Sequence, residues 1–230
     1  MFNFKKALCF FSHPDDETLG AGGTIKKMTD LGIEVHVAIS NTGIHSRRNK
    51  FSEEVRFESA KKLKSDCLNA LAHLNIKKNH VYFGNFSDNE IDKHTLLELV
   101  HWLEMIMDKI NPEAIFTHHK FCTNIDHRYC HEAAIVASRP TESRHIQIFS
   151  CEIPSSTGYL KPASWEPNYY VEISIDQLES KIKSMQTFEI EARKDPHPRS
   201  PEVLRALAKV RGSESGFSYA ESFIINQIFS

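Results

Sequence analysis

Short apolar runs alternate along the chain with longer segments in which apolar residues recur every three or four positions. Residues 33–40 show the first pattern, because Val35, Val37 and Ile39 alternate with other residues, as in a β-strand. Residues 53–74 show the second pattern, because their apolar residues fall on one face of a helix. We expect strands over residues 7–12, 33–40, 80–83, 114–118, 146–153 and 169–173, and helices over residues 18–30, 53–74, 93–110, 127–138, 176–192 and 202–210.

The order of these elements predicts the fold class. Strands separated by helical patterns indicate βαβ units and a parallel sheet covered on both faces. We therefore expect an α/β, Rossmann-like three-layer sandwich with a mostly parallel sheet, in which ligands bind beyond the carboxyl ends of the strands. No shift in composition divides the chain, so we expect residues 1–230 to form a single domain, with the C-terminal segment 193–230 packing back on it.

The composition excludes several classes of protein. The 28 basic and 30 acidic residues leave a formal net charge of −2 without any basic arm, so we expect no nucleic-acid partner. No run approaches the roughly 20 apolar residues that cross a bilayer, so we expect no membrane span. The five cysteines are odd in number and form no CxxC pair, and the N-terminus lacks a signal-peptide pattern. These features predict a cytoplasmic location.

Histidine is the residue type that stands out, with 13 copies, several of them close to cysteine or aspartate. A chain of this length can bury a core without a structural metal, so a metal site would serve chemistry. The first expected strand leads directly into His13-Pro14-Asp15-Asp16-Glu17. Clustered ionisable groups resist burial unless they face a site, and histidine and carboxylate ligands suit divalent zinc or iron.

His13 and Asp16 are therefore candidate ligands, because a turn can aim residues three positions apart at one point. Asp15 would then lie beside the metal as a general base toward a water molecule. The alternative is a solvated turn that caps the following helix, where acidic residues are favoured by the helix dipole.

A second cluster follows the fourth expected strand and contains His118, His119 and His127. In a parallel sheet this strand end can face the same site as His13. Catalytic zinc usually takes three protein ligands and leaves one position open, so His127 would complete the set. We expect His131 to be an exposed helical residue, and His118 and His119 either to pack in the core or to line the site.

Two other kinds of site compete with a catalytic metal. A closed structural zinc site could be formed by His119, Cys122, His127, Cys130 and His131, although their spacing differs from that of paired-ligand zinc fingers. A dinucleotide site is indicated by Gly20, Gly22 and Gly23 after the first strand. Against it, Lys26 occupies the third glycine position of that fingerprint, and carboxylates stand where a phosphate would bind.

The sequence resembles the PIG-L or LmbE-like family of metal-dependent de-N-acetylases. The resemblance rests on residues 13–17 with the glycines that follow, on Asn124-Ile125-Asp126-His127-Arg128, and on the closing stretches 211–212 and 219–223. It implies that His13, Asp16 and His127 bind Zn²⁺, with Fe²⁺ as the alternative, and that Asp15 is the general base.

The resemblance also implies roles for residues outside the ligand set. Asp126 matches a carboxylate that orients a histidine, and Glu17 matches a supporting residue. Arg47 and Asp88 resemble positions that bind sugar hydroxyls or an anionic substituent, and the alternative for both is an ordinary loop charge.

The chain departs from the family pattern at two positions. Asn124 replaces a histidine that is thought to stabilise the oxyanion or protonate the leaving amine. An asparagine can donate to an oxyanion but cannot deliver a proton, so His118, His119, Asp15 or another group would have to supply it. Cys122 stands where an aspartate is expected, and we have no physical account of that change.

The resemblance implies zinc-dependent hydrolysis of an N-acetyl group from a small sugar or sugar conjugate, with release of acetate and an amino sugar. Two alternatives stay open: a catalytically impaired relative that only binds its ligand, and an amidase acting on a non-sugar N-acyl substrate. An oligomeric assembly is compatible with the sequence.

Overall fold

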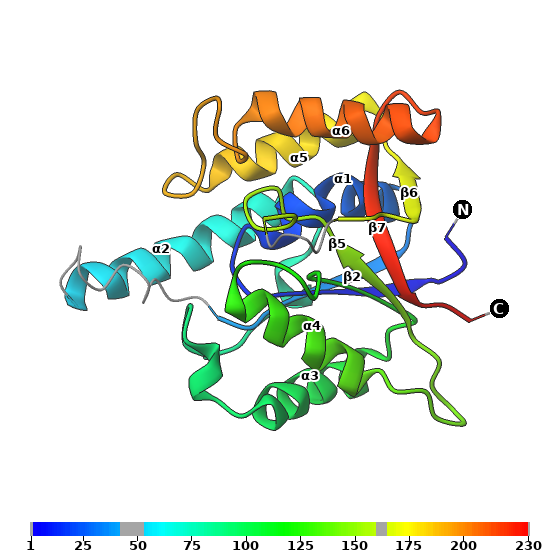
Figure 1. The fold of residues 1–230 in the computed structure, drawn as a ribbon. Coiled ribbons are helices and arrows are strands. Elements are labelled where there is room, and N and C mark those ends of the chain that lie inside the picture. Colours follow the sequence, from blue (N-terminus) through cyan, green and yellow to red (C-terminus); the bar gives the residue numbers. More distant parts are fainter. Residues whose placement is uncertain (1, 42–52, 160–164, 230) are drawn as a thin grey trace.

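The computed structural model describes residues 2–41, 53–159 and 165–229 (Figure 1). Within these ranges seven strands form one sheet in the order β3-β2-β1-β4-β5-β7-β6. The strands are β1 (Lys6–Phe11), β2 (Glu34–Ile39), β3 (Val81–Phe83), β4 (Ala114–Thr117), β5 (Gln147–Cys151), β6 (Tyr169–Glu172) and β7 (Ala220–Gln227). The α-helices are α1 (Asp16–Asp30), α2 (Glu53–Ala72), α3 (Leu96–Ile110), α4 (Ile125–Ala137), α5 (Ile175–Thr187) and α6 (Pro201–Ser215).

The helices cover the two faces of the sheet, which confirms the expected α/β fold with a mostly parallel sheet. Helices α1, α5 and α6 lie on one side of the strands and α3 and α4 on the other (Figure 1). Strands β1 to β5 run parallel to one another, and the buried apolar side chains of the structure divide into one core cluster on each face of the sheet. The continuous apolar run of β1 is explained by this burial on both faces.

Local sequence signals set the ends of several helices. Helix α3 begins with a capping box in which Thr95 and Glu98 each bond to the other's backbone N–H, and Ser174 and Gln177 do the same at α5. Helix α6 begins at Pro201 and ends before Gly216, whose φ of 77° suits a helix C-terminus. These caps explain why α5 and α6 begin within one residue of the predicted starts.

The C-terminal segment differs from the prediction because it contributes an eight-residue strand, β7, that we had not expected. This strand lies between β5 and β6 and runs antiparallel to both, so the last part of the chain forms the second strand from one edge of the sheet. The apolar residues Phe223, Ile224 and Ile225 were the available signal for it. They lie in a stretch that also carries polar residues, without the clear alternation seen in β2.

The glycines after β1 serve packing and lie inside α1, not in a loop before it. A Cβ atom at Gly22 would come within 2.9 Å of the Lys181 side chain, and one at Gly23 within 2.8 Å of Ile173. These glycines therefore let α1 approach α5 and the strands closely. A phosphate-binding loop would need them ahead of the helix, so the arrangement contradicts the dinucleotide alternative.

The strand order places a binding site where β1 lies between β2 and β4. The chain builds the sheet from β1 through β2 to β3 on one side and then continues with β4 and β5 on the other side of β1. In α/β sheets such a reversal of strand order leaves a crevice for ligands at the carboxyl ends of the strands. The two polar clusters predicted from the sequence follow β1 and β4, the neighbouring strands at this point. Among the described residues, none of the helices is long and apolar enough to cross a bilayer.

Candidate metal-binding active site

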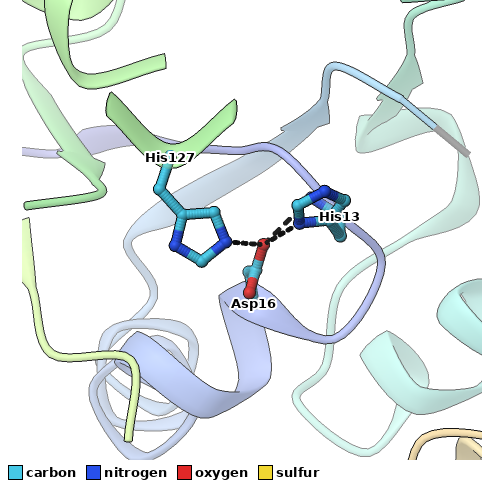
Figure 2. Close-up of side chains that lie close together, drawn as sticks. All are labelled: His13, Asp16 and His127. Carbon is cyan, nitrogen blue, oxygen red and sulfur yellow. Dashed lines mark hydrogen bonds and ion pairs between the residues drawn. The ribbon is translucent and has the colours of Figure 1, made fainter. Parts of the chain in front are cut away.

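The two clusters meet at the carboxyl end of the sheet, around the carboxylate of Asp16. The turn after β1 carries His13 and leads into α1, which begins at Asp16, whereas His127 comes from the first turn of α4. Nδ1 of His13 lies 3.0 Å and Nε2 of His127 lies 3.3 Å from Oδ2 of Asp16. Figure 2 shows both imidazoles pointing at this one oxygen.

The three side chains fit a divalent cation. Ligands about 2.1 Å from a tetrahedral zinc stand roughly 3.4 Å from one another. The separations here are close to that value, and the ligand atoms of His13, Asp16 and His127 all lie within 4.8 Å of one another. The donor set of two imidazoles and one carboxylate suits zinc or iron(II). The structure thus brings together the three residues that were predicted as ligands.

The carboxylate of Asp126 anchors the surroundings of His13. Its Oδ2 lies 3.0 Å from His13 Nε2 and accepts hydrogen bonds from the Asn41 side chain at 3.2 Å and the Asn89 backbone at 2.6 Å. Its Oδ1 accepts from the Ile91 backbone N–H at 3.3 Å. A histidine that donates Nε2–H to a carboxylate presents Nδ1, the nitrogen facing Asp16, as the ligand atom. This geometry agrees with the orienting role that was expected for Asp126.

Asp15 stands beside the cluster but has different partners. It occupies the N-cap position of α1, yet its side chain makes no capping hydrogen bond, which contradicts the alternative of a simple capping turn. Its Oδ2 lies 2.9 Å from Nη1 of Arg199. Its backbone N–H donates to Oε2 of Glu17, and burial raises the pKa of that glutamate to about 7. Burial likewise raises the pKa of Asp15 well above its ordinary value, and the Arg199 guanidinium opposes the rise.

The two residues expected to bind substrate have different outcomes. Asp88 is buried, and its Oδ1 lies 3.3 Å from Nε2 of His13, so it belongs to the immediate surroundings of the cluster. It also forms, with His13 and Asp126, a second group of possible ligand atoms. Arg47 lies outside the described residues.

Asn124 is the N-cap of α4, and its side-chain oxygen accepts the backbone N–H of Asp126 at 2.8 Å. Its amide nitrogen donates to Oδ1 of Asn89 at 2.9 Å. An amide nitrogen carries two hydrogens, and this bond uses one of them. The residue therefore joins the loop after β3 to the helix that carries His127.

His118 and His119 are both buried, and burial lowers the pKa of each. His118 stacks on His127 with ring centroids 3.8 Å apart, and its Nε2 accepts the Ser12 backbone N–H at 2.9 Å. The His119 ring packs edge-on against Phe121 and Trp165. His118 therefore borders the candidate ligands, whereas the described ring contacts of His119 are with aromatic side chains.

The prediction that His131 is exposed is wrong. The side chain is buried, and its Nδ1 bonds to the backbone oxygen of His118, because α4 packs this face against the sheet. The closed zinc alternative is also contradicted within the described chain. Cys122 bonds to Thr157 and Cys130 contacts Ser40, and neither cysteine takes part in a group of converging ligand atoms.

Sequence reasoning missed Arg199, Asn41 and Asn89. Arg199 lies 184 positions after Asp15 in a Pro-rich segment, and only the fold brings the two together. Asn41 follows the second strand directly, so its place at a carboxyl strand end was an available signal. Asn89 is next to Asp88, which was expected to bind substrate.

Comparisons with known proteins agree with this geometry. The model of the PIG-L family, described as GlcNAc-PI de-N-acetylase, matches residues 8–138, which include both clusters. Diacetylchitobiose deacetylase of Thermococcus kodakarensis is 30% identical over 226 residues, covering 94% of this chain and 81% of that protein. A probable N-acetyl-alpha-D-glucosaminyl L-malate deacetylase 2 of Bacillus cereus is 29% identical over 150 residues, covering 62% of this chain and 66% of that protein.

A solved structure extends the likeness to nearly the whole chain. N,N'-diacetylchitobiose deacetylase from Pyrococcus horikoshii, in complex with its inhibitor MPG, superposes with a TM-score of 0.77 at 25% sequence identity. The match covers 98% of this chain and 85% of that chain. The C-terminal elements α6 and β7 are thus shared with this neighbour, in addition to the part that the family model matches.

Proposed function

The chain belongs to the PIG-L family of N-deacetylases, and from this premise we propose that it removes an N-acetyl group from a small sugar-containing substrate, releasing acetate and an amino sugar. We propose zinc as the metal, with iron(II) as the alternative, bound by His13, Asp16 and His127. The observation that carries the proposal is the convergence of these three side chains on one point, with the Asp15 carboxylate beside them.

The metal, when bound, would act as a Lewis acid toward the amide carbonyl and the attacking water. Asp15 accepts the proton of that water at its carboxylate. Because Asp15 is only 2% exposed, its carboxyl group is shielded from bulk water and can hold this proton until the amine leaves. Asp126 fixes the ring of His13 through Nε2 and so orients Nδ1 toward Asp16.

Asn124 is proposed as a donor to the developing oxyanion, through the amide N–H that does not bond to Asn89. The proton for the leaving amine comes from Asp15 in this proposal. His118 and His119 are poor sources, because burial lowers the pKa of both and Nε2 of His118 already accepts a backbone N–H. One carboxyl group thus serves first as base and then as acid.

The substrate class follows from the relatives, which act on diacetylchitobiose or are described as acting on an N-acetylglucosaminyl malate. We propose an N-acetylglucosamine unit, free or conjugated, as the recognised group, with Asp88 and Arg47 as its contacts. The position of Asp88 next to His13 supports its part in this assignment. The proposed binding partner of the protein is therefore this small N-acetyl sugar or sugar conjugate.

The test is acetate release by the zinc-loaded protein from a panel containing N-acetylglucosamine, diacetylchitobiose, N-acetylglucosaminyl malate and N-acetyl amino acids. We expect turnover of the sugars. Turnover of only the amino acids would favour the non-sugar amidase, and tight binding without turnover would favour the impaired relative. Asp15→Asn should keep the metal and lose about 10²- to 10⁴-fold in kcat, the usual contribution of a general base. Asp108→Asn, at an exposed carboxylate of α3, is the matched control.

We also propose that residues 1–230 act as one domain in a reducing, cytoplasmic setting. The C-terminal segment supplies β7 to the sheet, and all five cysteines are free and buried.

A further inference from the structure

Asp15 and Asp16 are consecutive carboxylates that face different partners. Asp16 is directed at His13 and His127, whereas Asp15 lies against Arg199. The backbone of Asp15 has φ 117° and ψ −28°, a conformation that residues other than glycine rarely adopt. Such strain persists only where the surroundings hold it, and it often accompanies function. Here the strained turn accompanies the divergence of the two side chains.

Arg199 is itself held in place from several sides. Its Nη1, which faces Asp15, also pairs with Glu191, and its Nε lies 3.5 Å from the Ser155 hydroxyl. Its backbone N–H donates to the ring of His197 at 3.2 Å, and the next residue, Ser200, is the N-cap of α6. Both the backbone and the guanidinium are therefore anchored, so the arginine presents a fixed positive charge to Asp15.

That charge lies among several carboxylates. Glu191 pairs with the same Nη1 atom of Arg199, and Asp16 and Glu17 directly follow Asp15 in the chain, so like charges surround the Asp15 carboxylate. Asp15 is 2% exposed, so water screens these repulsions weakly. An ionised carboxylate buried in this way needs a fixed opposite charge to remain in one orientation. Arg199 supplies that charge.

We propose that Arg199 is a positioning residue for the general base, whose guanidinium fixes the orientation of the Asp15 carboxylate beside the metal ligands. The inference rests on the proposed function, because that function assigns the role of base to Asp15. Arg199 acts on turnover through Asp15. Through Arg199, the segment between α5 and α6 takes part in the site, because this segment places the arginine side chain next to the start of α1.

A cavity beside Arg199 allows chemical rescue of a variant that lacks this side chain. It has a volume of about 750 Å³, and its lining includes Arg199 together with residues of α5, α6 and the segment between them. In an Arg199→Ala variant the space left by the side chain would connect with this cavity. A small guanidinium compound can therefore reach the position that the natural guanidinium occupies.

The first experiment compares Arg199→Gln, Arg199→Lys and Arg199→Ala with the zinc-loaded wild type on the best N-acetyl sugar of the panel. We expect Arg199→Gln to lower kcat about 100-fold, the cost of misplacing a reacting group by roughly 1 Å, with little change in KM or zinc content. Arg199→Lys should retain more of kcat, and millimolar methylguanidinium should restore part of it to Arg199→Ala. Arg205→Gln is the matched control, because this α6 arginine pairs with Glu179 in a partly exposed ion pair.

The second experiment does not depend on turnover. In a crystal structure of Arg199→Gln we expect the Asp15 carboxylate to leave its present orientation, while His13, Asp16 and His127 keep theirs. The proposal is overturned if Asp15 stays in place, if kcat matches that of the wild type, or if neither lysine nor methylguanidinium restores activity. If the wild type turns over no substrate, the proposed function fails, and the crystal structure still decides the role of Arg199.

Discussion

Replacing Asp126 by asparagine tests the polar network around His13. The substitution keeps the shape of the side chain, removes its charge and converts one of its two acceptor oxygens into a donor. Among the residues that the structure describes, Oδ2 faces three donors, on His13, Asn41 and Asn89, whereas Oδ1 accepts from one, the backbone N–H of Ile91. The amide oxygen is therefore expected to take the Oδ2 position, and the NH₂ group to face Ile91.

Two magnitudes follow from this geometry. One buried backbone N–H, that of Ile91, loses its acceptor, which costs about 1–3 kcal/mol in the free energy of unfolding. The loss of the carboxylate that orients His13 should lower zinc affinity about 10- to 100-fold. Asp126→Ala leaves all four donors without this acceptor, so both effects should be larger.

The assay is a competition titration of zinc against a chelating dye, combined with urea unfolding of the metal-free protein. Asp108→Asn provides the control, because its carboxylate is exposed and pairs only with Arg144 among the described ion pairs. If Asp126→Asn bound zinc within twofold of the wild type, the carboxylate would not orient His13. If its unfolding free energy also matched the wild type, the hydrogen-bond network itself would be wrongly described.

Three further predictions concern the metal, a buried ion pair and the cysteines. Chelation should abolish acetate release and lower the Tm, because a metal present at 1,000 times its Kd stabilises the folded state by about 4 kcal/mol. An unchanged Tm would argue against the metal site. Lys181→Met should lower the free energy of unfolding in urea by about 3–5 kcal/mol, because it leaves the buried carboxylate of Glu221 without its cation. As a control, Lys26→Met removes a more exposed ion pair and should lower it by under about 1 kcal/mol. Burial raises the pKa of Cys122 to about 11 and of Cys130 to about 12, so at pH 8 their reactive thiolate forms are scarce. A thiol reagent should therefore label neither cysteine until the protein unfolds. Fast labelling of the native protein would contradict the described burial.

The buried ion pair between Lys181 and Glu221 also gives a structural role to the closing stretch 219–223. Glu221 accepts backbone N–H bonds from Gly23 and Thr24 in α1, and Lys181 of α5 donates both to Glu221 and to the backbone oxygen of Leu19. The closing stretch 219–223 is therefore used to fasten β7 to α1. Arg211, in the other closing stretch, pairs with Glu152 and so joins α6 to the residue that follows β5.

The sequence by itself determined the fold class and the three candidate metal ligands, and the physical reasons are local. Hydrophobic periodicity reports burial on one or both faces of an element, so the alternating strands and helices were visible without coordinates. Parallel strands end at one edge of the sheet, so two polar clusters at strand ends could be expected to meet. His13, Asp16 and His127 were identified in this way, and the structure brings them together.

Tertiary structure alone decided the contacts between residues far apart in the chain. Asp15 and Arg199, and His13 and Asp126, are joined by the strand order and by the path of the C-terminal segment, which no local pattern encodes. The place of β7 between β5 and β6 is of the same kind, because antiparallel pairing depends on which strand edge is free. Local sequence patterns report which residues are buried, whereas the partners of a buried charge depend on how the whole chain is packed.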